Sequence, residues 1–198
     1  RHPVYFKPQM TGAAVTQEHC DMMTDLLRRV RAMTIATAAK RGRPMLIAVR
    51  IPDSLGFSKG IGLDVERWLK EDLVDIITGT CYFHFEPWEN FVALGKKYDV
   101  PAYACLSGSR VVSSSDPERS DAETTPLWHG EAALAWRAGV DGIYIFNRFN
   151  PKDPLFRTLG STDTLMKLEK EPKPITGEKK SMERWLKGGS AFVKFPAD

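Results

Sequence analysis

The sequence predicts an α/β fold in which parallel (β/α) units form one half of a (β/α)8 barrel. Four apolar runs of strand length alternate with stretches of helical periodicity over roughly the first 150 residues. A complete barrel of eight such units typically needs about 250 residues, so this density corresponds to half a barrel. Polar residues follow each run at its C-terminal end, where a barrel places its active site, and short turn-forming connectors precede it.

The first predicted unit is a long helix followed by a strand. Apolar side chains recur at three- and four-residue spacing over residues 16–39, as on one face of a helix. Thr16 is the expected N-cap, and Gly42 ends the helix. Residues 45–52 form a nearly continuous apolar run, as expected of a strand buried on both faces.

The same alternation continues to residue 147. A short helix begins after Asp64, a second begins near Trp88 with Pro87 at its first position, and an Ala-rich third helix covers residues 127–138. A loop rich in Ser, Asp and Glu is expected between the last two helices, over residues 113–125. The remaining expected strands are residues 74–79, 101–106 and 142–147.

The end of the chain departs from this pattern. A helical stretch is expected around residues 162–169, followed by a Pro- and Gly-containing linker. Residues 191–195, which read AFVKF, are expected to form one β-strand. We therefore expect residues 1–170 to form the half-barrel, and residues 171–198 to form a linker and the start of a C-terminal β extension.

Two arrangements fit four such units. A small open sheet with helices on both faces is the alternative to the half-barrel. An isolated half-barrel leaves two strand edges unpaired, which proteins normally avoid. We therefore expect this chain, which begins at Arg1 without an initiator Met, to be a fragment. The missing N-terminal half then belongs to the same chain or to a second copy.

Composition excludes several classes of partner and cofactor. The 28 Lys and Arg against 25 Asp and Glu give a net charge of only +3, too little to indicate nucleic-acid binding. No apolar run is long enough to cross a membrane. The three cysteines include no C-x-x-C pair, so neither a structural metal nor a disulfide framework is expected. No cofactor is predicted.

Several spaced strings in the chain carry a family resemblance. They are RIPD at residues 50–53, GLDVERWLKE at 62–71, LVD at 73–75, PWE at 87–89, ALGKKY at 93–98 and WRAGVDGIYIFN at 136–147. Together they resemble the C-terminal half of the glycoside-hydrolase-like TIM-barrel proteins of bacterial polysaccharide degradation, over roughly residues 1–170. The resemblance implies hydrolysis of O-glycosyl bonds, further catalytic acids upstream of Arg1, and export to the periplasm or the outside of the cell.

Glycoside hydrolysis needs two carboxyl groups on either side of the scissile bond. Glu86 is the first candidate, because it follows aromatic residues and a histidine and stands where a strand-end loop turns into a helix. Asp53 and Glu89 are the second candidates. The structural alternative for Glu86, and more strongly for Glu89, is stabilisation of a helix N-terminus.

The residues expected to bind substrate are basic, polar or aromatic and follow predicted strands or open the chain. Arg50 has an alternative role as the ion-pair partner of Asp53, and His84 as a packed side chain. His84 and Glu86 alone do not predict a metal site, because a third ligand is missing. The full set is Arg1, His2, Arg50, Tyr82, His84, Trp88, Ser107, Arg110 and Asn147.

Three functions compete on these residues. The leading hypothesis is a glycoside hydrolase acting on a polysaccharide or oligosaccharide through carboxylate acid/base chemistry. The alternative is a non-catalytic glycan-binding barrel that uses the same aromatic and polar residues. A sugar-phosphate aldolase or isomerase ranks last, because no predicted strand carries a Lys and residues 147–150 are not glycine-rich.

Overall fold

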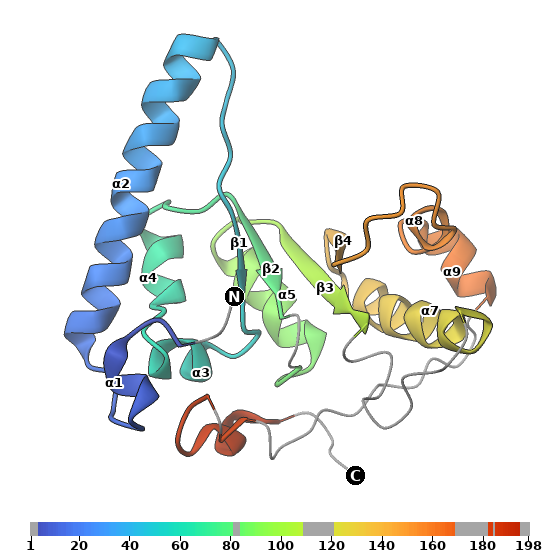
Figure 1. The fold of residues 1–198 in the computed structure, drawn as a ribbon. Coiled ribbons are helices and arrows are strands. Elements are labelled where there is room, and N and C mark those ends of the chain that lie inside the picture. Colours follow the sequence, from blue (N-terminus) through green and yellow to red (C-terminus); the bar gives the residue numbers. More distant parts are fainter. Residues whose placement is uncertain (1–3, 81–83, 109–120, 169–181, 184, 195–198) are drawn as a thin grey trace.

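A parallel sheet with one helix-covered face organises the chain (Figure 1). The structure is a computed structural model that describes residues 4–80, 84–108, 121–168, 182–183 and 185–194. Its strands pair in the order β1-β2-β3-β4, and every pairing is parallel. They are β1 (Ala48–Ile51), β2 (Ile76–Gly79), β3 (Ala102–Ser107) and β4 (Gly142–Phe146). The predicted parallel α/β arrangement is confirmed at this level.

A helix precedes each strand, as the alternation of the sequence predicts. These four helices are α2 (Gln17–Arg41), α4 (Val65–Lys70), α5 (Trp88–Lys97) and α7 (Asp121–Ala138). The other described helices lie near the chain ends and after β1 and β4. They are α1 (Lys7–Met10), α3 (Leu55–Gly60), α8 (Leu155–Thr158), α9 (Thr162–Leu168) and the 3-10 helix η1 (Gly189–Phe192).

The helix α2 begins and ends where its sequence predicts. Thr16 stands at the N-cap, where its backbone N–H donates to His19 Nδ1 at 3.1 Å. Gly42 ends the helix with a φ of 65°, in the left-handed region that glycine enters without strain. A buried hydrogen bond of 3.0 Å from Trp68 Nε1 to Thr24 Oγ1 ties α2 to α4. The C-terminal part of α2 projects beyond the sheet (Figure 1).

Alternate residues of each strand point to opposite faces of the sheet, and the two faces differ in chemistry. One face packs against α2, α4, α5 and α7 in two apolar clusters, which include Ile77 and Leu106. Gly79 belongs to this face, where an added Cβ would lie 2.8 Å from the Phe91 ring of α5. None of the described strand residues of the other face belongs to these clusters. They include Arg50, Thr78, Tyr103, Cys105, Ser107, Tyr144 and Phe146, and we call this side the aromatic face.

Two aspartates hold the N-terminal ends of the strands together in the same way. Asp75, just before β2, accepts a hydrogen bond of 2.6 Å from the backbone N–H of Ile47, just before β1. Asp141, just before β4, accepts one of 2.8 Å from the backbone N–H of Ala102 in β3. Each aspartate also donates its own backbone N–H to the carbonyl of the same residue, at 2.8 and 2.9 Å. This repeated contact locks the register of neighbouring strands at one end of the sheet.

The structure corrects the expectation that the first strand is buried on both faces. β1 is an edge strand of the described sheet, and Arg50 and Ala48 are exposed on it. The nearly continuous apolar run that suggested burial is split, because Met45 and Leu46 lie in an exposed connection before the strand begins.

Three expectations about local structure are also wrong or incomplete. Residues 121–125, expected in a loop, form the first turns of α7, while residues 113–120 lie outside the described residues. The expected strand at 191–195 is replaced by η1 over Gly189–Phe192, with residue 195 not described. The Glu183 carboxylate accepts hydrogen bonds from the backbone N–H groups of Gly188 and Ser190, which favours a tight turn over an extended strand. The helix α3 has no counterpart in the sequence prediction.

The expected domain boundary falls largely on residues that the structure does not describe. Residues 169–181 and 195–198 lie outside the described residues, so the expected linker is not seen. The described residues 185–194 pack on the first unit, since Phe192 lies against Phe57 with ring centroids 6.3 Å apart. None of the described helices is long and apolar enough to span a membrane.

The aspartate contacts at the strand starts lead to a stability prediction. Asp75→Ala and Asp141→Ala should each lower the free energy of unfolding by about 1–3 kcal/mol, because a strand N–H loses its acceptor. The loss should be larger for Asp75, whose removal also leaves Arg31 without its ion pair at 2.9 Å. Urea denaturation measures the change. The matched control Asp25→Ala breaks only the exposed ion pair with Arg29 within α2. It should lower the free energy of unfolding by about 0.5 kcal/mol or less. Equal costs for all three variants would contradict the role given to Asp75 and Asp141.

Candidate functional site

The candidate site lies at the end of the sheet where the parallel strands finish. Asp53 follows β1 by two residues, Thr80 follows β2 directly, and Ser107 closes β3. The loop before α5 brings His84 and Glu86 to the same end, because it connects β2 to the helix that covers the sheet. Carboxylate, imidazole and hydroxyl groups from three strands therefore converge here, as the sequence predicts for a site at strand ends.

Asp53 is a buried anchor for the loop between β2 and α5. The residue is 6% exposed, and both carboxylate oxygens accept the backbone N–H of Phe85, at 3.1 and 3.0 Å. Oδ2 also accepts the backbone N–H of Glu86 at 3.1 Å. Hydrogen bonds from backbone amides compensate a buried carboxylate, so the charge of Asp53 is held in place rather than exposed to substrate. This geometry makes Asp53 a positioning residue for Glu86.

His84 packs between Asp53 and Trp88, the first residue of α5. Its Nε2 atom lies 3.7 Å from Asp53 Oδ2, and its ring stacks on Trp88 with centroids 4.5 Å apart at 31°. His84 and Trp88 are each 3% exposed. Both were expected to contact substrate, but the structure places them in the wall behind the loop.

The β2 strand ends in strained backbone. Thr80 has a φ of 57°, in the left-handed region where a β-branched side chain is an outlier. Its backbone N–H donates to the Ile51 carbonyl of β1 at 2.7 Å, and its buried hydroxyl has no hydrogen-bond partner among the described residues. Such strain is concentrated at functional sites. The sequence gives no signal for it, because Thr is an ordinary residue in a strand.

Glu86 stands at the end of the same loop, and its side chain is 12% exposed. Its Oε2 atom accepts a hydrogen bond of 2.8 Å from Asn90 Nδ2, and Oε1 lies 3.2 Å from Lys194 Nζ. The Lys194 backbone N–H also donates to the Phe85 carbonyl at 2.6 Å, so the C-terminal segment crosses over this loop. The residue at the N-cap of α5 is Pro87, not Glu86. Glu89 lies in the first turn of α5 and is exposed.

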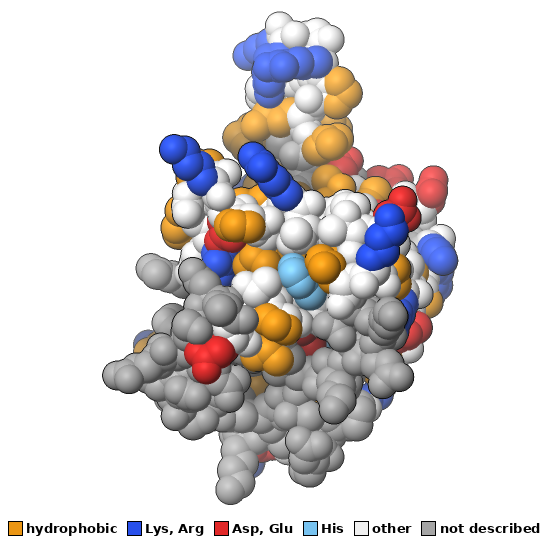
Figure 2. Space-filling model, turned by 90° about the vertical axis from the view of Figure 1, so that its right-hand side faces the viewer, with side chains coloured by type: hydrophobic (Ala, Val, Ile, Leu, Met, Phe, Trp, Pro, Cys, Tyr) orange, Lys and Arg blue, Asp and Glu red, His pale blue; other side chains and the backbone are white. Residues whose placement is uncertain are grey.

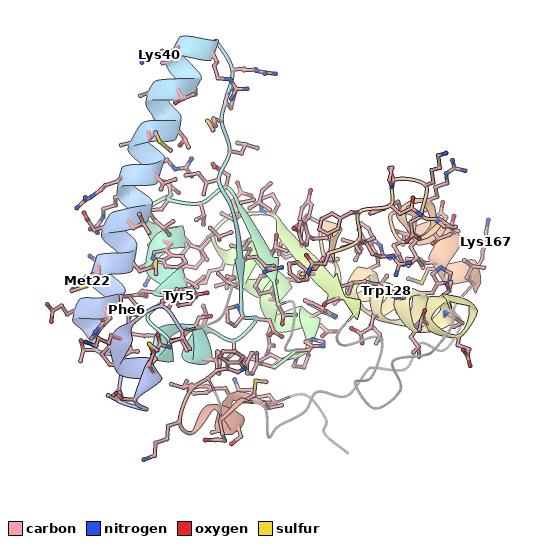
Figure 3. The ribbon with its side chains drawn as sticks, in the orientation of Figure 1. Tyr5, Phe6, Met22, Lys40, Trp128 and Lys167 are labelled. Carbon is pink, nitrogen blue, oxygen red and sulfur yellow. The ribbon has the colours of Figure 1, made fainter. Side chains whose placement is uncertain are left out.

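Arg50 lies on the aromatic face instead of pairing with Asp53. Its guanidinium carbon is 4.0 Å from the centroid of the Phe146 ring of β4, and such exposed cation–π contacts stabilise by about 0.5–1 kcal/mol. Tyr5, labelled in Figure 3, lies close enough for its phenol to sense this charge. Burial raises the pKa of Tyr5 above its ordinary value, and the positive charge of Arg50 opposes that rise.

Beyond β4 lies a cluster that the sequence analysis missed. Arg148 binds Asp153 through its Nε atom and lies over the Trp128 ring at 5.3 Å. Burial by itself raises the pKa of Asp153, but hydrogen bonds from the Leu155 backbone N–H and from Arg148 outweigh it and hold that pKa below its ordinary value. Asn147 is exposed here with a φ of 56°, a conformation that Asn tolerates. An Asn-Arg pair followed by an acid five residues later was the available signal.

Four expected binding residues lie outside the described residues: Arg1, His2, Tyr82 and Arg110. The structure therefore brings together Asp53, His84, Trp88 and Glu86, and places Arg50 on the aromatic face with Ser107. Among the residues that the structure describes, no three His, Cys, Asp or Glu side chains gather as metal ligands.

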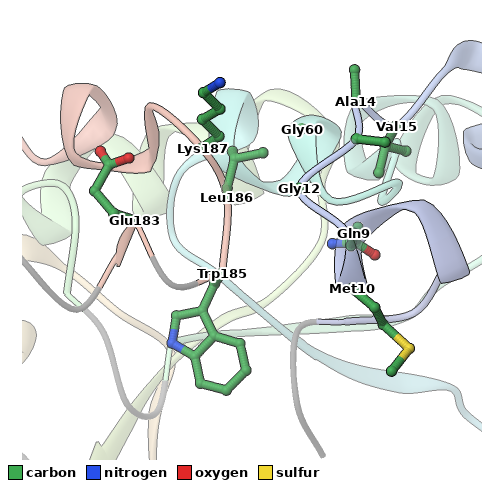
Figure 4. A pocket seen from close by; sticks show the side chains of 11 residues that line it. Gln9, Met10, Gly12, Ala14, Val15, Gly60, Glu183, Trp185, Leu186 and Lys187 are labelled. Atoms are coloured by element: carbon green, nitrogen blue, oxygen red, sulfur yellow. The ribbon is translucent and has the colours of Figure 1, made fainter.

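Two hollows lie away from the strand ends. One of about 470 Å³ separates the α1–α2 connection from Glu183 and residues 185–187, with Gln9, Met10, Trp185 and Lys187 in its lining (Figure 4). The other, of about 500 Å³, lies between the projecting end of α2 and the connection to β1, beside the exposed Ile35 and Leu46. Lys and Arg side chains gather at the tip above it (Figure 2).

Comparisons with known proteins add no identification. No family model matches the sequence, and no curated protein matches it either.

The anchoring role of Asp53 leads to a second prediction. Asp53→Ala should lower the free energy of unfolding by at least about 2 kcal/mol, because two backbone N–H groups lose their acceptor. Asp53→Asn keeps one acceptor oxygen and should cost clearly less. Urea denaturation gives the free energies, and amide hydrogen exchange at Phe85 and Glu86 should accelerate in Asp53→Ala. The control Glu89→Ala should change neither. Unchanged hydrogen exchange at both amides in Asp53→Ala would contradict the anchoring role of Asp53.

Proposed function

We propose that this chain is the C-terminal half of a (β/α)8-barrel glycoside hydrolase that acts on a polysaccharide or oligosaccharide. The observation that carries the proposal is the position of Glu86 at the C-terminal end of the sheet, on a loop that the buried Asp53 holds in place. Glu86 is the carboxyl group that this half contributes to acid/base chemistry. The second carboxyl group then comes from the other half.

The strand order supports a half-barrel over a doubly wound sheet. A doubly wound sheet reverses its strand order and covers both faces with helices, whereas this order advances without reversal. The four helices that precede the strands, α2, α4, α5 and α7, all pack with strand residues of the same face. β1 and β4 are three strand spacings apart, about 14 Å in a flat sheet. The contact between Arg50 and Phe146 is favoured when the sheet curls toward the aromatic face.

The surface beside β1 supports the presence of further units. In the described sheet β1 and β4 are edge strands, so each presents backbone groups to one open side. On α2, Met22, Leu26 and Met33 are each more than half exposed and fall on one stripe of the helix, since they are spaced by four and seven residues. Figure 3 shows Met22 pointing away from the sheet. In a closed barrel a neighbouring helix would cover this stripe.

The chemistry of the site supports a carbohydrate substrate. Tyr144 of β4 is 46% exposed, and Asn147 directly beyond β4 is exposed. Their ring, phenol and amide groups match the hydrogen bonds and apolar faces that sugars offer. Among the three acids that the sequence singles out, Asp53 is occupied by backbone amides and Glu89 sits on the exposed first turn of α5. Glu86 therefore remains as the carboxyl group best placed to act.

A non-catalytic glycan-binding barrel is the second candidate, and one observation favours it. Both oxygens of Glu86 already have partners, Asn90 at 2.8 Å and Lys194 at 3.2 Å. A carboxylate held in this way can bind a sugar hydroxyl without transferring a proton. Turnover by the complete protein separates the two functions.

Glu86→Gln tests the catalytic role. In the complete protein this variant should lose at least about 100-fold in turnover, as expected when a group that transfers a proton is removed. Its unfolding midpoint should stay close to that of the parent. A panel of polysaccharides with reducing-sugar detection supplies the assay, and Glu89→Gln is the matched control with unchanged turnover. Full activity in Glu86→Gln would exclude Glu86 from the mechanism, and binding without turnover in the parent would favour the binding protein.

The half-barrel proposal predicts the size of the working protein. Either the native protein has a mass well above the 22.3 kDa of this chain, or two copies of the chain associate. Mass spectrometry of the native protein and sedimentation velocity of the chain measure this. Leu26→Glu, on the exposed stripe of α2, should weaken association or destabilise the longer chain, while Leu168→Glu on α9 should do neither. A native protein that is a 22.3 kDa monomer would contradict the proposal.

A further inference from the structure

The positive charge on the aromatic face lacks an acidic partner. Arg50 is the only charged side chain that the described strands place on this face, and it is exposed. Within the described part of the chain no carboxylate lies within ion-pair distance of it. By contrast, Arg31, Arg67 and Arg148 each pair with an acid. The arginines that pair stabilise the fold, so Arg50 is available for a different role.

The stacking of Arg50 leaves its hydrogen-bonding edge available. The guanidinium carbon lies 4.0 Å from the Phe146 ring centroid, so the ring covers one side of the group. A guanidinium carries five N–H donors in one planar fork, and a single phenyl ring beside it does not occupy all of them. A planar fork held in this way matches the two oxygens of a carboxylate or sulfate group. The ring also restricts the side chain, so less rotamer freedom is lost when an anion binds.

The neighbours of Arg50 suit a sugar that carries this anion. Tyr103 and Tyr144 belong to the same face, and Tyr144 is 46% exposed. Thr78 pairs in register with Arg50 on the next strand but is buried, so the tyrosines supply the hydroxyls of this face. The positive charge of Arg50 opposes the effect of burial on the pKa of Tyr5. Aromatic rings and hydroxyls around one uncompensated cation fit a ligand with apolar faces, hydroxyls and a negative charge.

We propose that Arg50, stacked on Phe146, forms a subsite for an acidic sugar, so that the glycan of the proposed function carries carboxylate or sulfate groups. The inference rests on the proposed function and adds the charge of its substrate. A neutral sugar can only accept hydrogen bonds from the guanidinium, whereas an anionic one also compensates its charge and can steer toward it from solution. Arg50 selects the substrate and takes no part in bond cleavage.

Binding of matched probes to the complete protein tests the proposal by isothermal titration calorimetry. The probes are trigalacturonic acid, its methyl ester and a sulfated disaccharide. The acid should bind at least tenfold more tightly than the ester at low salt, and the difference should shrink as salt rises. Arg50→Gln should abolish the difference, Arg50→Lys should keep part of it, and Phe146→Leu should reduce it. Arg43→Gln removes an equal charge from an exposed position before β1 and should change nothing.

The charge of Arg50 can also be tested without a ligand, through its effect on the pKa of Tyr5. Arg50→Gln should raise the pKa of Tyr5, because the cation that opposes the effect of burial is gone. An ultraviolet titration of the tyrosines, with Tyr5→Phe to assign the signal, measures this. The unfolding midpoint of Arg50→Gln should remain close to that of the parent, since the side chain is exposed.

The outcomes separate this inference from the proposed function. Tighter binding of the sulfated probe than of the uronate identifies sulfate as the group and supports the subsite. Equal binding of acid and ester, or an unchanged preference in Arg50→Gln, overturns the subsite and leaves carbohydrate binding intact. Polyglutamate is added as an anion that is not a carbohydrate. If it binds as tightly as trigalacturonic acid, the subsite is contradicted, because the protein then binds any polyanion by charge alone. If no sugar binds, whatever its charge, the proposed function and the subsite both fail.

Discussion

The apolar packing of the long helices on a single face of the sheet is the constraint on which the rest of the structure depends. Parallel strands need crossover connections, and these connections are right-handed almost without exception. Because the strand order advances in one direction from β1 to β4, each crossover returns on the same side. Residues such as Ile77, Ala104 and Leu106 are buried there. The opposite face and the strand ends are thereby released from packing the core, and the chemically distinctive residues lie in those two places.

The two ends of the sheet use the same contact for different purposes. At the N-terminal end, Asp75 and Asp141 each bind a backbone N–H of the neighbouring strand and fix its register. At the C-terminal end, Asp53 also accepts backbone N–H groups, but these belong to the loop that carries Glu86. An aspartate at a strand end therefore does not by itself indicate catalysis. The function of Asp53 follows from what it holds in place.

The order and type of the main elements could be predicted from the sequence, because periodicity reports which residues are buried. The helix caps Thr16 and Gly42 were also predictable, since capping depends on local chemistry. The partners of individual side chains could not be predicted in this way. Arg50 stands three residues before Asp53 in the sequence, yet it stacks on Phe146, which is distant in the chain and close only in the fold. Trp88 looked like a surface for a sugar because sequence does not report whether an aromatic ring faces solvent or the core.

The errors at the chain end have a similar physical origin. Residues 191–193 are an apolar run that suits a strand. A strand needs a neighbour for its backbone hydrogen bonds, however, and Glu183 instead draws Gly188 and Ser190 into a turn. That turn brings Lys194 to the loop of Glu86. The segment expected to start a separate extension thus completes the surroundings of the candidate acid. Sequence periodicity cannot reveal this, because the contact joins residues that are more than a hundred positions apart.

The incomplete set of carboxyl groups and the incomplete sheet point to the same solution. Cleavage of a glycosidic bond uses two carboxyl groups. Among the described residues, Glu86 is the one that the proposed enzyme would use. A sheet with two open edges likewise lacks the strands that would close it. In the proposed barrel, the units that close the sheet also bring further strand ends toward Glu86 from the opposite wall. Closure of the barrel would then also complete the catalytic pair. The aromatic face becomes the inner face of the proposed barrel, where Arg50 would contact the substrate that both halves enclose.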